Sequence, residues 1–146
     1  MTSATAVDLE WAIRKSFVAY VEALPDGGVE VEGGASRTAD GAFVFPAIEG
    51  EELAFAGSVR FHGHAGVLDV TISDPRIEPR GDSADVTVAL VSGRIRFATV
   101  GALERAVAGV VSSADVAATD DGAYVLGGIY QPGAPLDPFT VHTAAA

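Results

Sequence analysis

The amino-acid sequence predicts a mainly β protein, an antiparallel β-sandwich or barrel-like domain with one N-terminal helix. Before Pro25, apolar residues recur every three or four positions, as in a helix packed on a core. Beyond Gly28 they alternate with polar residues, as in half-buried strands, and glycine or proline separates the alternating segments. A chain of 146 residues is long enough to bury a core as one domain over 1–146.

The helix is expected over about residues 9–24. The apolar residues with helical spacing are Leu9, Ile13, Phe17, Val21 and Leu24. Asp8 is placed to cap the first turn, and Pro25-Asp26-Gly27-Gly28 ends the helix. Trp11 and Val18 fall on a second side, so we expect the helix to be buried on two faces.

The rest of the chain predicts a series of short strands. A period of two, many β-branched residues and flanking turn residues support that assignment. The expected ranges are 29–32, 42–45, 54–61, 67–72, 85–91, 94–100, 107–111 and 140–142. A short helical turn over 120–126, with Thr119 as its cap, is an additional option.

Charge and composition exclude several function classes. Nine basic against twenty acidic residues give a net charge of −11, which disfavours binding to nucleic acid or to anionic lipid. The chain has no cysteine, so it offers no disulfide framework and no thiolate metal site. No apolar run approaches the roughly 20 residues of a membrane span. No basic and apolar leader is visible before Leu9, which favours a cytoplasmic chain or a domain of a longer protein.

A histidine stands at an expected hairpin corner. If one strand ran straight from Ala54 to Ile72, polar and apolar side chains would share a face. A turn at Gly63-His64-Ala65-Gly66 removes this conflict and places His64 between two glycines. Such a corner admits close approach by another backbone or a flat ligand, although on spacing alone the ordinary interpretation is that the glycines serve only the turn.

Ser16 and Tyr20 lie four residues apart and therefore share one flank of the expected helix. That flank borders the apolar stripe without belonging to it. A tyrosine there is ordinarily an amphipathic residue at the edge of a core, and a serine within a helix ordinarily bonds its own backbone. The spacing alone does not assign a function to either.

Three segments of the chain stand out together: W-A-I-R-K-S-F-V-A-Y (11–20), G-S-V-R-F-H-G-H-A-G-V-L-D-V-T-I-S-D-P-R-I (57–77) and G-G-I-Y-Q-P-G-A-P-L-D-P-F-T (127–140). In this order they resemble the signatures of the HtaA domain, an actinobacterial haem-binding module. The resemblance covers about residues 9–143. It implies a mostly β domain that takes up haem at the cell surface or as a secreted protein and passes it to other proteins of an uptake relay.

The resemblance also implies roles for single residues. Tyr20 would be the axial ligand of ferric haem b, His64 would hydrogen-bond that tyrosine, and Ser16 would contact the porphyrin edge or a propionate. A phenol has an unperturbed pKa of about 10, so both Fe³⁺ and an imidazole N–H would help to form the phenolate. Phenolate is a hard donor that prefers ferric to ferrous iron, which suits a carrier that must release its cargo.

Further residues near the three segments could complete a haem pocket. Phe17, Val59 and Phe61 could cover the porphyrin faces or be plain core residues. Tyr130 could close the edge of the pocket or only anchor the last turn. The cations nearest the motifs are Arg14, Lys15 and Arg60, which could meet the propionates or be plain surface charge.

One histidine, His62, departs from the family pattern. It could compete with His64 for the tyrosine, lie in solvent or reach the iron from elsewhere. Because it alternates with Ser58 and Arg60 on the polar side of the strand, we expect it to lie in solvent. His142, near the end of the chain, has no visible partner and is expected to be exposed.

Three other interpretations compete with haem binding. A metal site of His62, His64 and Asp69 has suitable H-x-H spacing, but its third ligand is unsupported. An acidic β-sandwich could be an adhesion or carbohydrate-binding module, although exposed aromatic residues are scarce. A hydrolase that uses Ser16 and His64 lacks a nucleophile-elbow motif, so no catalysis is predicted.

Overall fold

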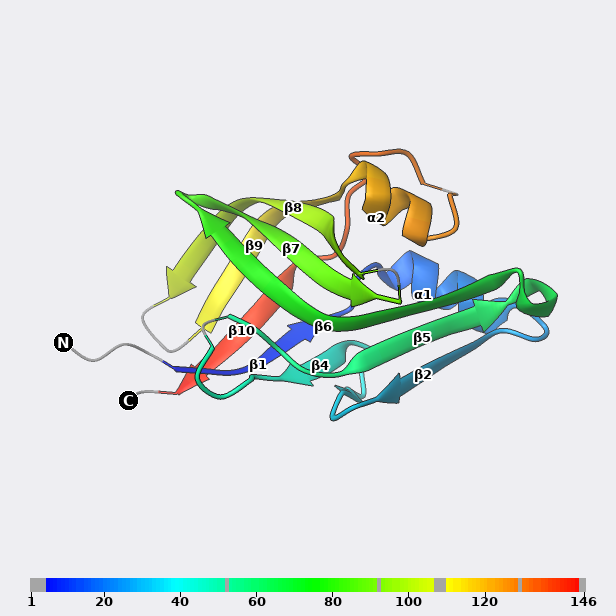
Figure 1. The fold of residues 1–146 in the computed structure, drawn as a ribbon, viewed down its shortest axis with the longest axis horizontal. Helices are drawn as coiled ribbons and strands as arrows, with labels where there is room; N and C mark the ends of the chain where they lie inside the picture. The colour runs from blue at the N-terminus through cyan, green and yellow to red at the C-terminus, as the bar shows by residue number, and fades with distance from the viewer. Residues whose placement is uncertain (1–4, 52, 92, 107–109, 129, 145–146) are drawn as a thin grey trace.

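The computed structural model describes residues 5–51, 53–91, 93–106, 110–128 and 130–144 (Figure 1). It confirms a mainly β protein in which antiparallel pairing predominates, with two α-helices among the described residues. The elements in chain order are β1 Thr5–Trp11, α1 Lys15–Ala23, β2 Gly28–Glu32, β3 Ser36–Arg37, β4 Phe43–Pro46, β5 Ser58–Gly63, the 3₁₀ turn η1 His64–Gly66, β6 Leu68–Arg80, β7 Ser83–Leu90, β8 Gly93–Ala106, β9 Val110–Ala118, α2 Asp120–Val125 and β10 Phe139–Ala144.

One hydrogen-bonded ladder joins these strands in the order β2-β5-β6-β7-β8-β9-β10-β1-β4-β3. The long strand β6 pairs with β5 over its first half and with β7 over its second, and the register shifts between Ser73 and Arg76. Isolated bridges of Ala47 with Phe55 and of Ala54 with Arg76 connect β4 back to β6. The second half of β6 and strands β7, β8, β9, β10, β1 and β4 therefore curl into a barrel-like body, called the barrel below.

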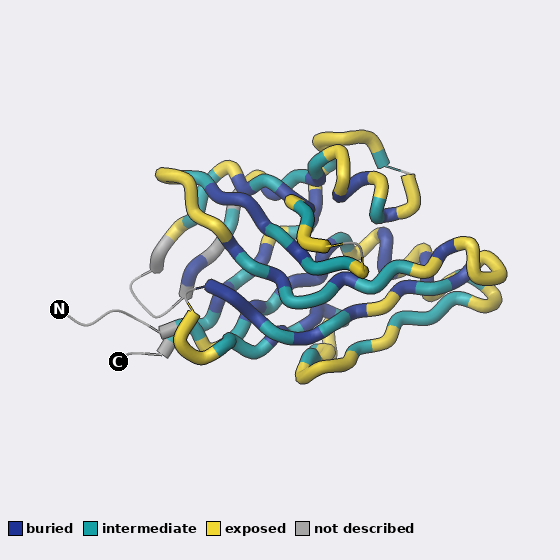
Figure 2. Tube along the Cα trace, in the orientation of Figure 1, coloured by how far each residue is buried: buried dark blue, intermediate teal, exposed yellow. Residues whose placement is uncertain are grey.

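The short strand β3 pairs with β4 at the end of the ladder, and the other remaining strands extend away from the barrel. Strand β2, strand β5 and the first half of β6 form a long three-stranded ribbon that ends at η1, and helix α1 lies along it (Figure 1). We call this ribbon with α1 the arm. Figure 2 shows buried residues along the interior of both parts and exposed residues at the arm's tip.

The barrel has an aromatic centre. The Trp11 ring meets those of Phe97 and Phe139 edge to face at 5.9 and 6.1 Å between centroids. The Trp11 indole N–H donates to the Asp137 carbonyl at 2.7 Å, so its polar atom is satisfied although the residue is only 1% exposed.

The arm has its own apolar layer between α1 and the ribbon. Phe17 on α1 packs edge to face on Phe61 of β5 at 5.1 Å between centroids. Val59 and Phe61 point inward, whereas Arg60 and His62 alternate with them on the outer face. The strand therefore presents one apolar and one polar face, as its sequence pattern predicts.

The expected start of the N-terminal helix is wrong. Residues as far as Trp11 belong to strand β1, which lies between β10 and β4, and the helix begins only at Lys15. Leu9 and Trp11 are buried from a strand with a period of two, and Ile13 then takes a left-handed φ of 62°. Since Leu9 and Ile13 are both buried for these separate reasons, their spacing of four imitates a helical stripe.

Two smaller expectations about that segment are also wrong. Arg14, not Asp8, occupies the cap position of α1, and its side chain makes no capping hydrogen bond. Asp8 instead contacts His142 across the β1–β10 pair, with Nδ1 and Oδ1 2.6 Å apart. His142 therefore has a carboxylate partner, contrary to expectation, although its side chain is still 43% exposed.

Most of the expected strands are confirmed, and the structure adds β1 and the short β3. The optional helical turn is confirmed as α2, where the Thr119 hydroxyl accepts a hydrogen bond from the Gly122 N–H. Of the expected strand 107–111, residues 107–109 lie outside the described part, and β9 begins at Val110. Neither described helix has the length and apolar character that crossing a membrane requires.

Candidate functional site

Tyr20 and His64 meet at the exposed end of the arm. The Tyr20 hydroxyl and His64 Nε2 are 2.6 Å apart, and the two rings lie 5.9 Å apart between centroids. Tyr20 comes from α1 and His64 from η1, so the contact joins the helix to the tip of the β5–β6 hairpin. Tyr20 is 39% exposed, which leaves its hydroxyl within reach of a ligand from solvent.

The backbone at the hairpin tip is left-handed over three residues. The φ angles are 50° at His64, 55° at Ala65 and 89° at Gly66. The expected corner is therefore confirmed, with the Val67 N–H donating to the His64 carbonyl at 3.0 Å. For non-glycine residues a left-handed conformation costs roughly 1–2 kcal/mol each, so other contacts must hold this turn.

Asp26 supplies such contacts. The N–H groups of His64 and Ala65 donate to its two carboxylate oxygens, at 3.2 and 2.6 Å respectively. These hydrogen bonds, chiefly that from Ala65, lower the pKa of the Asp26 carboxyl below its ordinary value, so the group is ionised at neutral pH. The sequence identified Asp26 only as part of the helix end, because no local pattern shows that it faces a turn 38 residues later.

Two glycines allow the loop after α1 to lie against the hairpin. A Cβ atom on Gly27 would fall 1.8 Å from the Val21 carbonyl oxygen, which is impossible without movement of the backbone. A Cβ atom on Gly63 would lie 2.6 Å from Leu24 Cδ1. Glycine at both positions therefore lets α1 and η1 approach closely enough for the Tyr20–His64 contact.

Ser16 and Tyr20 both lie on the exposed flank of α1, and Arg14 adds a cation at its N-terminal end. Arg14 Nε donates to the Ser16 hydroxyl at 2.9 Å. Its guanidinium carbon lies 4.2 Å from the centroid of the Tyr130 ring, and its Nη1 donates to the Pro135 carbonyl. Tyr130 also packs edge to face on Phe17, so the third sequence segment contacts the first.

Phe17, Phe61 and Val59 lie in the core. Phe17 is 1% exposed, and the other two are completely buried. They form the apolar layer on which α1 rests, next to the flank that presents Tyr20. Their burial places them behind the exposed pair in this structure.

Arg60 and His62 point to the other face of the ribbon. Arg60 makes a bidentate ion pair with Asp69 at 2.9 and 3.1 Å, which lowers the pKa of the Asp69 carboxyl. His62 Nε2 lies 3.2 Å from Glu30 Oε1, and its side chain is half-buried and not free in solvent. Within the described ranges, no three His, Cys, Asp or Glu side chains gather as a metal site would require, so the set of His62, His64 and Asp69 is not assembled.

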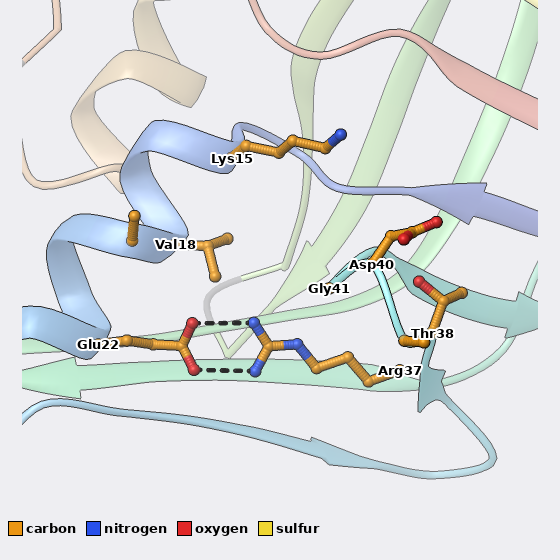
Figure 3. Close-up of a pocket in the computed structure, with 9 residues that line it drawn as sticks. Lys15, Val18, Glu22, Arg37, Thr38, Asp40 and Gly41 are labelled. Carbon is orange, nitrogen blue, oxygen red and sulfur yellow. Dashed lines mark hydrogen bonds and ion pairs between the residues drawn. The ribbon is translucent and has the colours of Figure 1, made fainter.

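A separate cavity of about 500 Å³ opens beside the flank of α1 that carries Lys15, Val18 and Glu22, not the flank that carries Ser16 and Tyr20 (Figure 3). Its lining residues are Lys15, Val18, Ala19, Glu22, Arg37, Thr38, Ala39, Asp40 and Gly41. A bidentate Glu22–Arg37 ion pair, with both N–O distances 3.0 Å, ties the helix to β3 at its edge. Lys15 therefore lies on the cavity side, away from the Ser16–Tyr20 flank.

The chain matches a known protein family. The HtaA family model, described as Htaa, matches residues 6–142. The chain belongs to the HtaA family. No curated protein matches the sequence.

Solved HtaA-type domains share this fold. The N-terminal domain of HtaA from Corynebacterium glutamicum is 26% identical, with a TM-score of 0.80 over 97% of this chain and 99% of that one. The C-terminal domain of the same protein is 24% identical, with a TM-score of 0.77 over 99% and 100%. The haem-binding protein HtaB from that organism is 22% identical, with a TM-score of 0.80 over 100% and 98%.

Proposed function

We propose that this HtaA-family domain captures ferric haem b through the Tyr20 oxygen and passes it on in haem uptake. The observation that supports this most directly is the 2.6 Å contact between the Tyr20 hydroxyl and His64 Nε2 at an exposed position. The fold is shared with HtaB, which is a haem-binding protein. The proposed activity is transport without catalysis.

The pair has the chemistry that a ferric ligand requires. A phenol binds Fe³⁺ as phenolate, and an imidazole that donates a hydrogen bond to the oxygen stabilises that charged form. His64 donates through Nε2 in the tautomer that carries its proton there. Because phenolate is a hard donor, reduction of the iron weakens the bond and favours release of the haem.

Arg14 is the cation best placed for a haem propionate. It lies at the N-terminal end of the Ser16–Tyr20 flank and already bonds the Ser16 hydroxyl. Arg60 is engaged by Asp69 on the other face of the ribbon, and Lys15 faces the opposite flank of the helix. In a chain of charge −11, a local cation of this kind offsets repulsion between the protein and the two propionates.

The aromatic residues have different roles in this proposal. Tyr130 lies under the Arg14 guanidinium and closes the edge of the site beside Ser16. Phe17 and Phe61 provide the apolar layer next to Tyr20, and the porphyrin rests against the margin of that layer. We place the protein at the cell surface or in secreted form, with haem donors and further relay proteins as its partners.

Titration with ferric haem tests the proposal. The wild-type protein is expected to give a saturable Soret band together with the charge-transfer bands of a tyrosinate-bound high-spin iron. Tyr20→Phe should abolish that spectrum, because it removes the ligand oxygen. Tyr124→Phe is the matched control, since Tyr124 is an exposed tyrosine on α2. Absence of a saturable band in the wild type would exclude haem binding.

The histidines provide a second test. His64→Ala should weaken binding by roughly 10- to 100-fold while tyrosinate ligation persists, as expected for loss of a group that supports a ligand. His62→Ala should leave the spectrum and affinity unchanged, because its side chain pairs with Glu30 on the other face. Equal effects of the two substitutions would mean that the contact with Tyr20 does not support the iron ligand.

A further inference from the structure

The Tyr20–His64 contact depends on a turn that is not stable by itself. His64 and Ala65 both adopt left-handed conformations, which non-glycine residues avoid. Inside the turn, one backbone hydrogen bond joins Val67 to His64. The 3₁₀ segment is only three residues long, and all three are exposed. Its geometry must therefore be fixed from outside.

The Asp26 carboxylate is the contact that can do so. Each of its oxygens accepts one N–H, so the group holds two successive peptide units of the turn at once. A bidentate, charge-assisted arrangement of this kind is stronger and more directional than a neutral hydrogen bond. Since the hydrogen bonds go to the backbone of His64 and Ala65, they set the direction in which the His64 imidazole leaves the chain.

Asp26 is itself fixed to the helix that carries Tyr20. The Leu24 N–H donates to the Val21 carbonyl at 3.1 Å, and the Gly27 N–H donates to the Leu24 carbonyl at 3.0 Å. The loop around Asp26 is thus bonded back to the last turn of α1. The Asp26 carboxylate therefore links the helix that carries Tyr20 to the turn that carries His64.

We propose that Asp26 is a positioning residue of the haem site, which holds the His64 turn so that the imidazole meets the Tyr20 oxygen and which acts on haem through His64. This inference rests on the proposed function. It assigns to Asp26 no contact with the haem or its iron.

A double-mutant cycle in the full chain tests it. Asp26→Ala is expected to raise the Kd for ferric haem by up to about tenfold, because His64 then samples other orientations. In a His64→Ala background the same change should have no further effect, because the residue through which Asp26 acts is absent. Asp82→Ala is the matched control, since it removes an exposed carboxylate from the β6–β7 turn and should leave the Kd unchanged in both backgrounds. An unchanged Kd for Asp26→Ala, or equal losses in both backgrounds, would overturn the proposal.

A haem-free measurement separates this inference from the proposed function. In NMR spectra of the protein without haem, Asp26→Ala should shift the His64 imidazole signals toward those of an unconstrained histidine, and Asp82→Ala should not. Asp26→Asn keeps one acceptor oxygen, so it should give an intermediate shift, and it replaces the alanine variant if that one does not fold. Unchanged His64 signals in the folded Asp26 variant would refute the positioning role. If the wild type fails to bind haem while these shifts appear, the proposed function is wrong and the positioning role remains.

Discussion

In the barrel, Trp11 is enclosed between Phe97 and Phe139 and its single polar atom is satisfied, whereas in the arm Tyr20 and His64 meet at the surface. The barrel strands close through the bridges of Phe55 with Ala47 and of Ala54 with Arg76. The arm ends in an exposed turn with two left-handed non-glycine residues. The aromatic centre of the barrel therefore lies apart from the candidate chemistry at the tip of the arm.

This difference suggests a division of tasks. Local backbone strain reduces stability, but a ligand site needs accessible groups in a defined geometry. The barrel can supply stability because its aromatic centre excludes water. The arm then tolerates a strained turn, because strand β6 runs continuously from one part into the other. Substitutions in the two parts should therefore separate stability from haem binding.

Trp11→Ala should have the largest effect on stability. Removal of a fully buried aromatic side chain should lower the free energy of unfolding by about 3–5 kcal/mol, since it loses burial and leaves a cavity. Denaturant unfolding measures this free energy. It is followed by circular dichroism, because the variant lacks the only tryptophan of the chain and so cannot be followed by tryptophan fluorescence. The haem affinity of the molecules that remain folded should match the wild type. A loss below 1 kcal/mol would show that the barrel centre is not the main source of stability.

Gly27→Ala tests the junction between helix and hairpin. The new Cβ would overlap the Val21 carbonyl oxygen, so the loop must move at a cost of roughly 1–3 kcal/mol. Since Asp26 would move with it, haem affinity should fall as well.

Gly50→Ala provides the comparison for Gly27→Ala. At Gly50 nothing lies within 4 Å of an added Cβ, but the φ of 83° makes a side chain unfavourable. We expect the free energy of unfolding to fall by about 1 kcal/mol, with unchanged haem affinity. Loss of affinity in both variants would mean that binding follows global stability and not the geometry of the arm.

Local sequence patterns predicted several of the features that distinguish the arm and the barrel. Alternation predicted strands with one apolar and one polar face, the glycines around His64 indicated a corner, and Thr119 indicated the cap of α2. Spacing of four also put Ser16 and Tyr20 on one flank, as observed.

The failures have a common physical cause, because they involve contacts between residues distant in sequence. Leu9 and Ile13 imitate a helical stripe, and only the neighbours β10 and β4 make residues up to Trp11 a strand. The partner of His142 lies 134 residues away, and that of Asp26 lies in the hairpin tip. Periodicity reports local geometry and holds no information about such pairings. The family resemblance, not spacing, selected Tyr20 and His64 from other ordinary residues.

Ala65→Gly examines the strain in the arm, with a smaller effect of opposite sign. Glycine adopts the φ of 55° without steric cost, so the free energy of unfolding should rise by up to about 1 kcal/mol, part of the gain being offset by the freer unfolded chain. Ala19→Gly, on the exposed side of α1, should instead lower it by about 1 kcal/mol. Thermal unfolding of both variants measures the difference. An equal decrease in the free energy of unfolding of both variants would contradict a left-handed turn at Ala65.

Glu22→Gln should have the smallest effect, because Glu22 and Arg37 form a partly exposed ion pair that joins the arm's helix to β3. The Arg37 hydrogen bonds lower the pKa of the Glu22 carboxyl from its ordinary value of 4.5. A lowered folded-state pKa means that the pair stabilises the protein above pH 4.5 and loses this contribution as the pH falls through the folded-state pKa. The wild type should exceed the variant by a few tenths of a kcal/mol at neutral pH and low salt, and this difference should vanish in acid or at high salt. Denaturant unfolding at several pH values measures it, with Glu49→Gln in an exposed turn as the control. A difference that persists in acid would show that Glu22 supports the helix by packing and not by charge, in which case the contact between α1 and β3 does not depend on this ion pair.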